Sequence, residues 1–104
     1  MQYRIEISEL AEKQYDNILN YLLNRKKNPQ AVSNVMEDFD YTVGQLRSKT
    51  DVFGYCRDER LRAMGFWKLH FKSHRYLFVY RIHSDRVIIE GMYHELQDYE
   101  NAIT

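Results

Sequence analysis

With 104 residues, the chain predicts one domain spanning residues 1–104, and its formal net charge of zero disfavours nucleic-acid binding, which usually needs a net positive charge. The lone Cys56 excludes an internal disulfide, and no Cys/His spacing resembles a zinc site, so we expect neither a metal nor a cofactor. The chain has no signal-peptide pattern and no run of the ~20 apolar residues that span a bilayer, which together predict a cytoplasmic protein without a membrane partner.

The N-terminal half predicts one strand followed by two helices. Residues 2–7 alternate polar and apolar side chains, as a strand with one buried face does. Ser8 stands where a helix N-cap is wanted, and apolar residues at helical spacing then predict a helix from about residue 9 to about residue 25. Asn28-Pro29 is a restart signal for a second helix, roughly 29–47. The short turn between them predicts an antiparallel helical hairpin whose apolar stripes pack on the sheet.

The C-terminal half predicts three strands after a polar connection, residues 48–64, which has loop character and room for a short helical turn. The strands are Phe66–Lys72, Arg75–Ile82 and Arg86–Tyr93, and the short loops between them join antiparallel neighbours. The order β-α-α-β-β-β predicts an α+β fold, an antiparallel sheet with the helical hairpin on one face. The expected core contains Ile5, Ile7, Ile18, Leu22, Val35, Phe39, Leu46, Leu69, Tyr76, Phe78 and Ile88.

Charge is distributed unevenly along the chain. Residues 57–86 carry eight Lys or Arg against three acidic residues, whereas the last eighteen residues carry four acids and no Lys or Arg. In the first strand of the meander, Lys68 and His70 alternate with Trp67 and Leu69, so that the basic groups share one face. This basic face, which also holds histidine, is the best candidate for a working surface, and it suits an acidic partner.

An ordered set of motifs runs along nearly the whole chain. It consists of Tyr3-x-Ile5-x-Ile7-Ser8, Asn28-Pro29-x-Ala31, His74-Arg75-Tyr76-Leu77-Phe78-Val79-Tyr80-Arg81-Ile82 and Tyr93-His94-x-x-x-Asp98. The set resembles the RelE/ParE superfamily, the toxins of bacterial type II toxin–antitoxin modules. The long helical hairpin and the His-x-x-x-Asp ending resemble the ParE branch more than the RelE branch.

The resemblance implies a toxin that forms a hetero-oligomer with a cognate antitoxin. Members of the ParE branch are not nucleases, and the resemblance implies that they inhibit DNA gyrase. The alternative is the RelE branch, whose members cleave messenger RNA on the ribosome. Leu77 stands about where that branch has a catalytic Arg, and His94 is not followed by the expected basic residue. These departures favour a toxin that acts by binding; a third reading is an inactive or repurposed member.

Each reading has its own site residues. Metal-free RNA cleavage needs a base, an acid and cations around the phosphate. For an endoribonuclease, the candidate catalytic residues are Lys68, His70, Arg75 and His94. For a binding toxin, the candidate target-binding residues are Arg62, Lys68, Lys72, Arg75, Arg81, His94 and Asp98.

Overall fold

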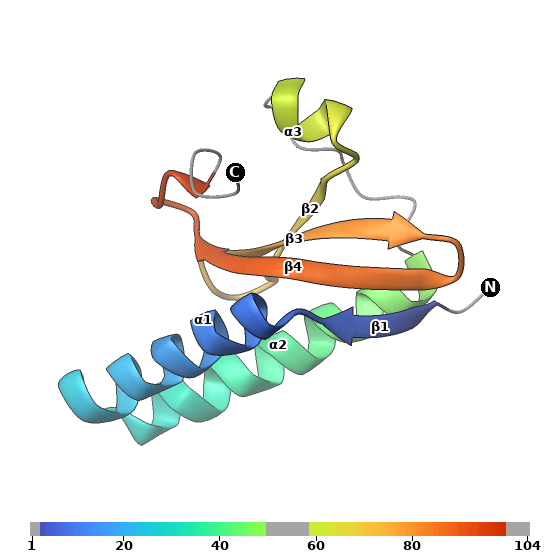
Figure 1. Ribbon diagram of the computed structural model, residues 1–104. Coiled ribbons are helices and arrows are strands. Elements are labelled where there is room, and N and C mark those ends of the chain that lie inside the picture. The colour runs from blue at the N-terminus through green and yellow to red at the C-terminus, as the bar shows by residue number, and fades with distance from the viewer. Residues whose placement is uncertain (1–2, 50–58, 100–104) are drawn as a thin grey trace.

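The computed structural model describes residues 3–49 and 59–99, so that Cys56 and most of the predicted connection lie outside the described residues. Its elements follow the predicted order, with one short helix before the meander (Figure 1). They are β1 (Arg4–Ile7), α1 (Glu9–Asn20), the π-helical turn η1 (Tyr21–Arg25), α2 (Pro29–Lys49), α3 (Glu59–Ala63), β2 (Trp67–His70), β3 (Tyr76–His83) and β4 (Arg86–His94). The predicted α+β fold is confirmed. None of the described helices is both long and apolar enough to cross a membrane.

The four strands form one sheet in the order β1-β4-β3-β2. The predicted antiparallel pairing is confirmed for β2 with β3 and for β3 with β4. It is wrong for β1, which lies parallel to β4, with Ile5 opposite Val87 and Ile7 opposite Ile89. A parallel pair needs a long crossover connection, and here the helical hairpin, α3 and two strands together make that connection.

Local signals start both long helices as predicted. The Ser8 hydroxyl accepts a hydrogen bond from the Ala11 amide at 3.1 Å, and the Asn28 side chain accepts one from the Ala31 amide at 3.1 Å. Each cap satisfies a backbone N–H group that the helix itself leaves without a partner. The first helical segment reaches Arg25, as expected, but its last turn, η1, is π-helical.

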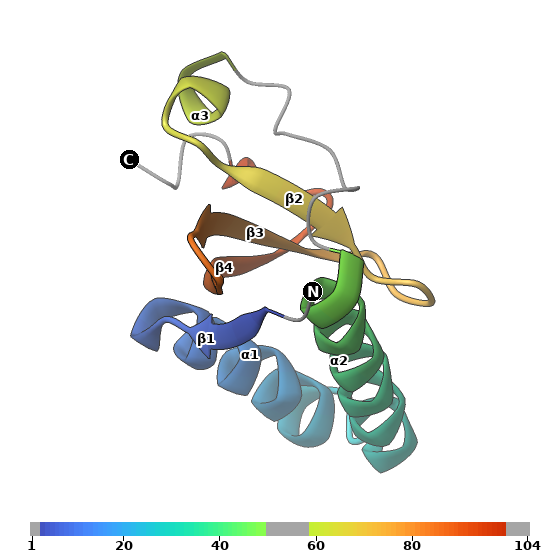
Figure 2. The same ribbon diagram turned by 90° about the vertical axis from the view of Figure 1, so that its right-hand side faces the viewer.

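The helical hairpin covers one face of the sheet, where α1 and α2 lie side by side (Figure 1 and Figure 2). Phe39 of α2 stacks on Tyr15 of α1, with ring centroids 3.9 Å apart, and meets Phe78 of β3 edge-on at 5.3 Å. Of the expected core residues, Val35, Leu46 and Phe78 are fully buried, and most of the others pack around them half-buried. The buried cluster on this face comprises Ala11, Leu46, Phe71, Phe78, Tyr80, Val87, Ile89 and Met92.

The core prediction is wrong for Leu22 in η1 and for Ile88 in β4, both of which are half-buried outside this cluster. Val87 and Ile89, the neighbours of Ile88, are buried in the helix-facing cluster, whereas Ile88 lines a pocket of about 290 Å³ with Arg81 and Arg86. Successive side chains of a strand point to opposite faces, so a strand that is apolar on both faces cannot be assigned by alternation alone.

A second apolar cluster lies on the sheet face opposite the helical hairpin, which we call the outer face. It is contributed by α3, the segment before β2, strands β3 and β4 and the segment after β4, and it comprises Leu61, Phe66, Leu77, Val79, Tyr93 and Tyr99. The face on which Lys68 and His70 were expected to form an open basic surface is therefore covered in part by apolar residues. Leu77 and Val79 of the middle strand are apolar, and α3 and Tyr99 remove them from water.

Candidate functional site

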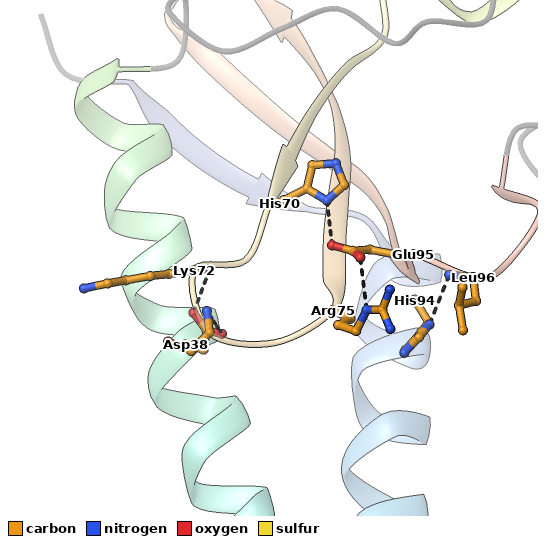
Figure 3. Close-up of polar contacts among 8 residues, drawn as sticks. Asp38, His70, Lys72, Arg75, His94, Glu95 and Leu96 are labelled. Atoms are coloured by element: carbon orange, nitrogen blue, oxygen red, sulfur yellow. Dashed lines mark hydrogen bonds and ion pairs between the residues drawn. The ribbon is translucent and has the colours of Figure 1, made fainter.

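Three polar side chains meet just beyond the end of β4, and we call them the Glu95 cluster: His70, Arg75 and Glu95 (Figure 3). The imidazole Nδ1 of His70 lies 3.0 Å from Oε1 of Glu95, and Nε of Arg75 donates to Oε2 of Glu95 at 3.4 Å. The backbone adds a third link, because the Glu95 amide donates to the Arg75 carbonyl at 2.8 Å. One carboxylate thus joins two of the predicted site residues.

Sheet topology brings these residues together from three separate places in the chain. His70 ends β2, Arg75 ends the turn that precedes β3, and Glu95 follows β4. β3 pairs antiparallel with β2 and with β4. The end of β2, the start of β3 and the end of β4 therefore lie at the same end of the sheet. Tyr76 is the register partner of His94, which places the next residue, Glu95, beside Arg75.

The charge of Glu95 is stabilised by its neighbours. The hydrogen bond from His70 is the main cause that holds the pKa of Glu95 below its ordinary value. Partial desolvation opposes this effect, while the hydrogen bond from Arg75 and the charges of both partners lower the pKa further. Glu95 is therefore ionised at neutral pH and occupies one donor of each partner.

Replacing Glu95 should weaken the dependence of stability on acid pH. Because the pKa of Glu95 is lower in the folded chain than in the unfolded chain, its ionised form stabilises the fold above the ordinary value of 4.5. This contribution is lost as the pH falls through the lowered pKa of the folded state. Urea denaturation should show the wild type as more stable than Glu95→Gln at neutral pH, with the difference shrinking as the pH falls from 4.5 through the lowered pKa of Glu95.

The matched control for this measurement is Glu37→Gln, because Glu37 is an exposed carboxylate on α2 outside the Glu95 cluster. Both variants remove one negative charge, so any general effect of net charge appears in each. Identical pH profiles for the two variants would show that pairing at Glu95 does not contribute to stability.

His94 lies beside the cluster but has partners of its own. Its Nδ1 accepts a hydrogen bond from the Leu96 amide at 3.1 Å, so the neutral ring carries its proton on Nε2. Its ring packs edge-on against Tyr76, with centroids 5.4 Å apart, and its amide donates to the Gln97 side chain at 2.8 Å. These contacts fix the orientation of the imidazole.

His94 and Tyr76 also line a groove of about 530 Å³ between α1 and the strands. The groove is lined by Gln14, Asn17, Ile18, Tyr21, Tyr76, Met92, His94 and Gln97, none of which is a carboxylate. Burial, and secondarily Tyr21, raises the pKa of the Tyr76 hydroxyl, so Tyr76 is neutral at physiological pH.

The other predicted site residues lie apart from the Glu95 cluster. Lys72 points away from it (Figure 3), with its ammonium 4.8 Å from the centre of the Tyr41 ring on α2. Arg81 pairs with Glu90, its Nε 3.1 Å from Oε2, and lies over the ring of Phe66. The seven candidates for target binding therefore do not form one patch.

Lys68, Arg62 and Asp98 complete the predicted set. Lys68 is half-buried on the outer face of β2, two residues before His70, and its ammonium pairs with no residue of the described ranges 3–49 and 59–99. Arg62 is exposed on α3, and Asp98 is exposed beyond β4. Lys68 is thus the predicted cation that shares both strand and face with a member of the Glu95 cluster.

Sequence reasoning missed two carboxylates, Glu95 and Asp38. Asp38 lies on α2 with its side chain only 4% exposed, and it accepts hydrogen bonds from the Lys72 amide at 3.2 Å and the Ser73 amide at 3.0 Å. It also lies 2.6 Å from Nδ1 of His74. A signal was present, since Asp38 falls three residues after Val35 on the apolar stripe, where a carboxylate needs partners. Nothing local pointed to Glu95.

No group of three or more His, Cys, Asp or Glu side chains within residues 3–49 and 59–99 is arranged to hold a metal ion. Among these residues, the fold places histidine and arginine side chains next to carboxylates, as in the Glu95 cluster and at Asp38. Such an arrangement suits recognition through charge-assisted hydrogen bonds, and a carboxylate–imidazole pair also suits proton transfer.

Comparisons with known proteins identify the family and the fold. The family model of the ParE toxin of type II toxin-antitoxin system, parDE, matches residues 5–99, whereas no curated protein matches the chain. A chromosomal ParDE TA system from P. aeruginosa superposes with a TM-score of 0.70 at 14% identity, covering 89% of this chain and 96% of that chain. The RelBE2 toxin-antitoxin complex from Mycobacterium tuberculosis gives 0.56 at 20% identity, covering 90% and 99%. These two likenesses show the fold, and the family match covers nearly the whole chain. The chain belongs to the ParE toxin family of type II toxin–antitoxin systems.

Proposed function

We propose that this chain inhibits growth by binding an essential protein target, DNA gyrase, and that a cognate antitoxin neutralises it. Membership of the ParE toxin family supports the toxin role. The similar solved structures are titled as a ParDE system and a RelBE2 toxin-antitoxin complex, which supports an antitoxin as partner. The gyrase target follows from the resemblance to the ParE branch.

The observation that carries the binding mechanism is that a carboxylate already pairs with the cation beside the candidate catalytic histidines. Glu95 accepts a hydrogen bond from Arg75 and lies 3.0 Å from His70, so its negative charge offsets the charge of Arg75. Cleavage of RNA without a metal needs a base, an acid and cations at the phosphate. Leu77, where the RelE branch has its catalytic Arg, is buried in the outer-face cluster and supplies none of these.

The alternative is a RelE-like ribosome-dependent endoribonuclease, and one observation favours it. A carboxylate that bonds one ring nitrogen of a histidine can orient the other nitrogen as a general base. Glu95 stands in that relation to His70, and Lys68 lies on the same face of β2. In this reading Lys68 and Arg75 stabilise the phosphate and His94 acts as the acid.

We expect the C-terminal segment of the antitoxin to lie along the helical hairpin and the sheet. Large apolar side chains are exposed on the hairpin, namely Leu10, Tyr21, Leu23, Met36 and Tyr41. Such side chains, separated by charged residues, suit a segment that is disordered alone and folds on binding. The antitoxin is expected to be a small protein encoded by an adjacent gene, and co-expression with it should yield a stable complex.

Single and combined substitutions distinguish binding from catalysis. For a binding toxin, His70→Ala or His94→Ala should reduce the affinity for gyrase at most about fivefold, because one exposed polar contact contributes about 1 kcal/mol or less. Joint replacement of Lys68, Arg75 and Arg81 by alanine should abolish growth inhibition, because their contributions add. Growth of induced cells and inhibition of gyrase supercoiling by purified protein measure the two effects.

Lys13→Ala is the control, because Lys13 is exposed on α1 and pairs with Glu9 away from the outer face. It should retain full inhibition. For a nuclease, removal of a general acid or base costs about 10²–10⁴-fold in rate. Loss of all toxicity in a folded His70→Ala or His94→Ala variant, together with cleavage of ribosome-bound message by the wild type, would therefore establish the endoribonuclease.

A further inference from the structure

The buried carboxylate of Asp38 is the strongest polar feature outside the Glu95 cluster. The three groups that contact its carboxylate, two backbone amides and one imidazole, all belong to one short segment, the β2–β3 turn of residues 71–75. Oδ1 accepts from the Lys72 amide, and Oδ2 accepts from the Ser73 amide and faces the His74 imidazole. A buried carboxylate is costly unless it is hydrogen-bonded, so these three contacts stabilise the packing of the turn against α2.

The same turn ends at the Glu95 cluster (Figure 3). Its base is closed by the hydrogen bond from the Phe71 amide to the Tyr76 carbonyl, at 2.9 Å. Its last residue, Arg75, contacts Glu95 through both its carbonyl and its guanidinium, and Glu95 in turn contacts His70. The residues that contact the carboxylate of Asp38 are therefore next to Arg75 in the same short turn, and hydrogen bonds fix the backbone of that turn.

We propose that Asp38 and His74 are positioning residues that set the conformation of the β2–β3 turn and thereby hold Arg75 and His70 in the geometry that binds the target. This inference rests on the proposed function for the identity of the target. Asp38 lies on α2, and its carboxylate contacts residues of the turn. The proposed role therefore does not require Asp38 or His74 to touch the target. The long helical hairpin then acts as the support of a site at the end of the sheet.

The first test is spectroscopic and needs no target. In isotope-labelled chain, Asp38→Asn should shift the NMR signals of the Arg75 Nε–H, the Glu95 amide and the His70 ring, because the turn loses its carboxylate acceptor. Asp40→Asn is the matched control, since Asp40 is an exposed carboxylate two residues along the same helix. It should leave these three signals unchanged. A folded Asp38→Asn variant with unmoved signals would overturn the proposal.

His74→Asn serves where Asp38→Asn does not fold. It keeps the Asp38 carboxylate and its two backbone hydrogen bonds while removing the imidazole, so smaller shifts of the same signals are expected. Both folded variants should also bind gyrase more weakly than the wild type, and unchanged binding despite shifted signals would overturn the link to the target. If the wild type itself does not bind gyrase, the proposed function fails, and the NMR result alone decides whether the two residues position the cluster.

Discussion

Phe78→Ala should lower the free energy of unfolding by about 3–5 kcal/mol, the largest loss we expect from a single substitution. Phe78 is fully buried at the centre of β3, between the sheet and the helical hairpin. Its ring meets Phe39 edge-on at 5.3 Å and Phe71 at 4.9 Å. Truncation removes these contacts and leaves a cavity between α2 and the sheet, because packed helices and strands collapse only in part. Urea denaturation followed by circular dichroism measures the loss.

Leu96→Ala is the control for this experiment, because Leu96 is 76% exposed. It should change the free energy of unfolding by no more than about 0.5 kcal/mol. A loss below about 1 kcal/mol for Phe78→Ala would mean that the hairpin does not pack on this face as the structure has it. A large loss should also remove growth inhibition, since the site depends on the pairing of β3 with both of its neighbours.

Leu61→Ala should lower the free energy of unfolding by about 2–3 kcal/mol, at the lower end of the range for buried leucines. Leu61 of α3 is fully buried against the outer face of the sheet, in the cluster that contains Leu77 and Tyr93. The expected loss is smaller than for Phe78 because α3 is a single short turn that can shift to fill part of the cavity. Urea denaturation gives the magnitude, and amide exchange of Leu77 and Val79 reports whether the outer face opens locally.

Met64→Ala is the control for Leu61→Ala, because Met64 is close to Leu61 in the chain but is not buried. Met64 follows α3 directly and is 47% exposed, so its truncation should leave both stability and amide exchange almost unchanged. Equal effects of the two substitutions would show that α3 does not cover the outer face. A destabilised Leu61→Ala variant with intact exchange protection at Leu77 would place the loss elsewhere in the molecule.

The structure brings together only part of the predicted site, and the carboxylate that links this part was not predicted. His70, Arg75 and His94 were singled out from charge and strand position, and the structure brings all three to one end of the sheet. Glu95, which links two of them, was missed because its role depends on where β4 ends relative to the β2–β3 turn. Lys72 and Arg81 were grouped with them by sequence, yet contacts with Tyr41 and Glu90 hold them elsewhere. Their part in target binding stays a prediction.

The sequence by itself determined the order of elements, the starts of both long helices and the inward face of β2. Ser8 and Asn28 each cap a helix by accepting a hydrogen bond from the amide three residues further along the chain. Leu69 and Phe71 share a face because successive side chains of a strand point to opposite sides. Interactions between near neighbours in the chain can be recognised without knowing the fold. The parallel direction of β1, the covering of the outer face and the partners of Asp38 and Glu95 were decided only by the tertiary structure. Each joins segments more than 15 residues apart, so its contacts exist only after the strands have paired and the hairpin has packed.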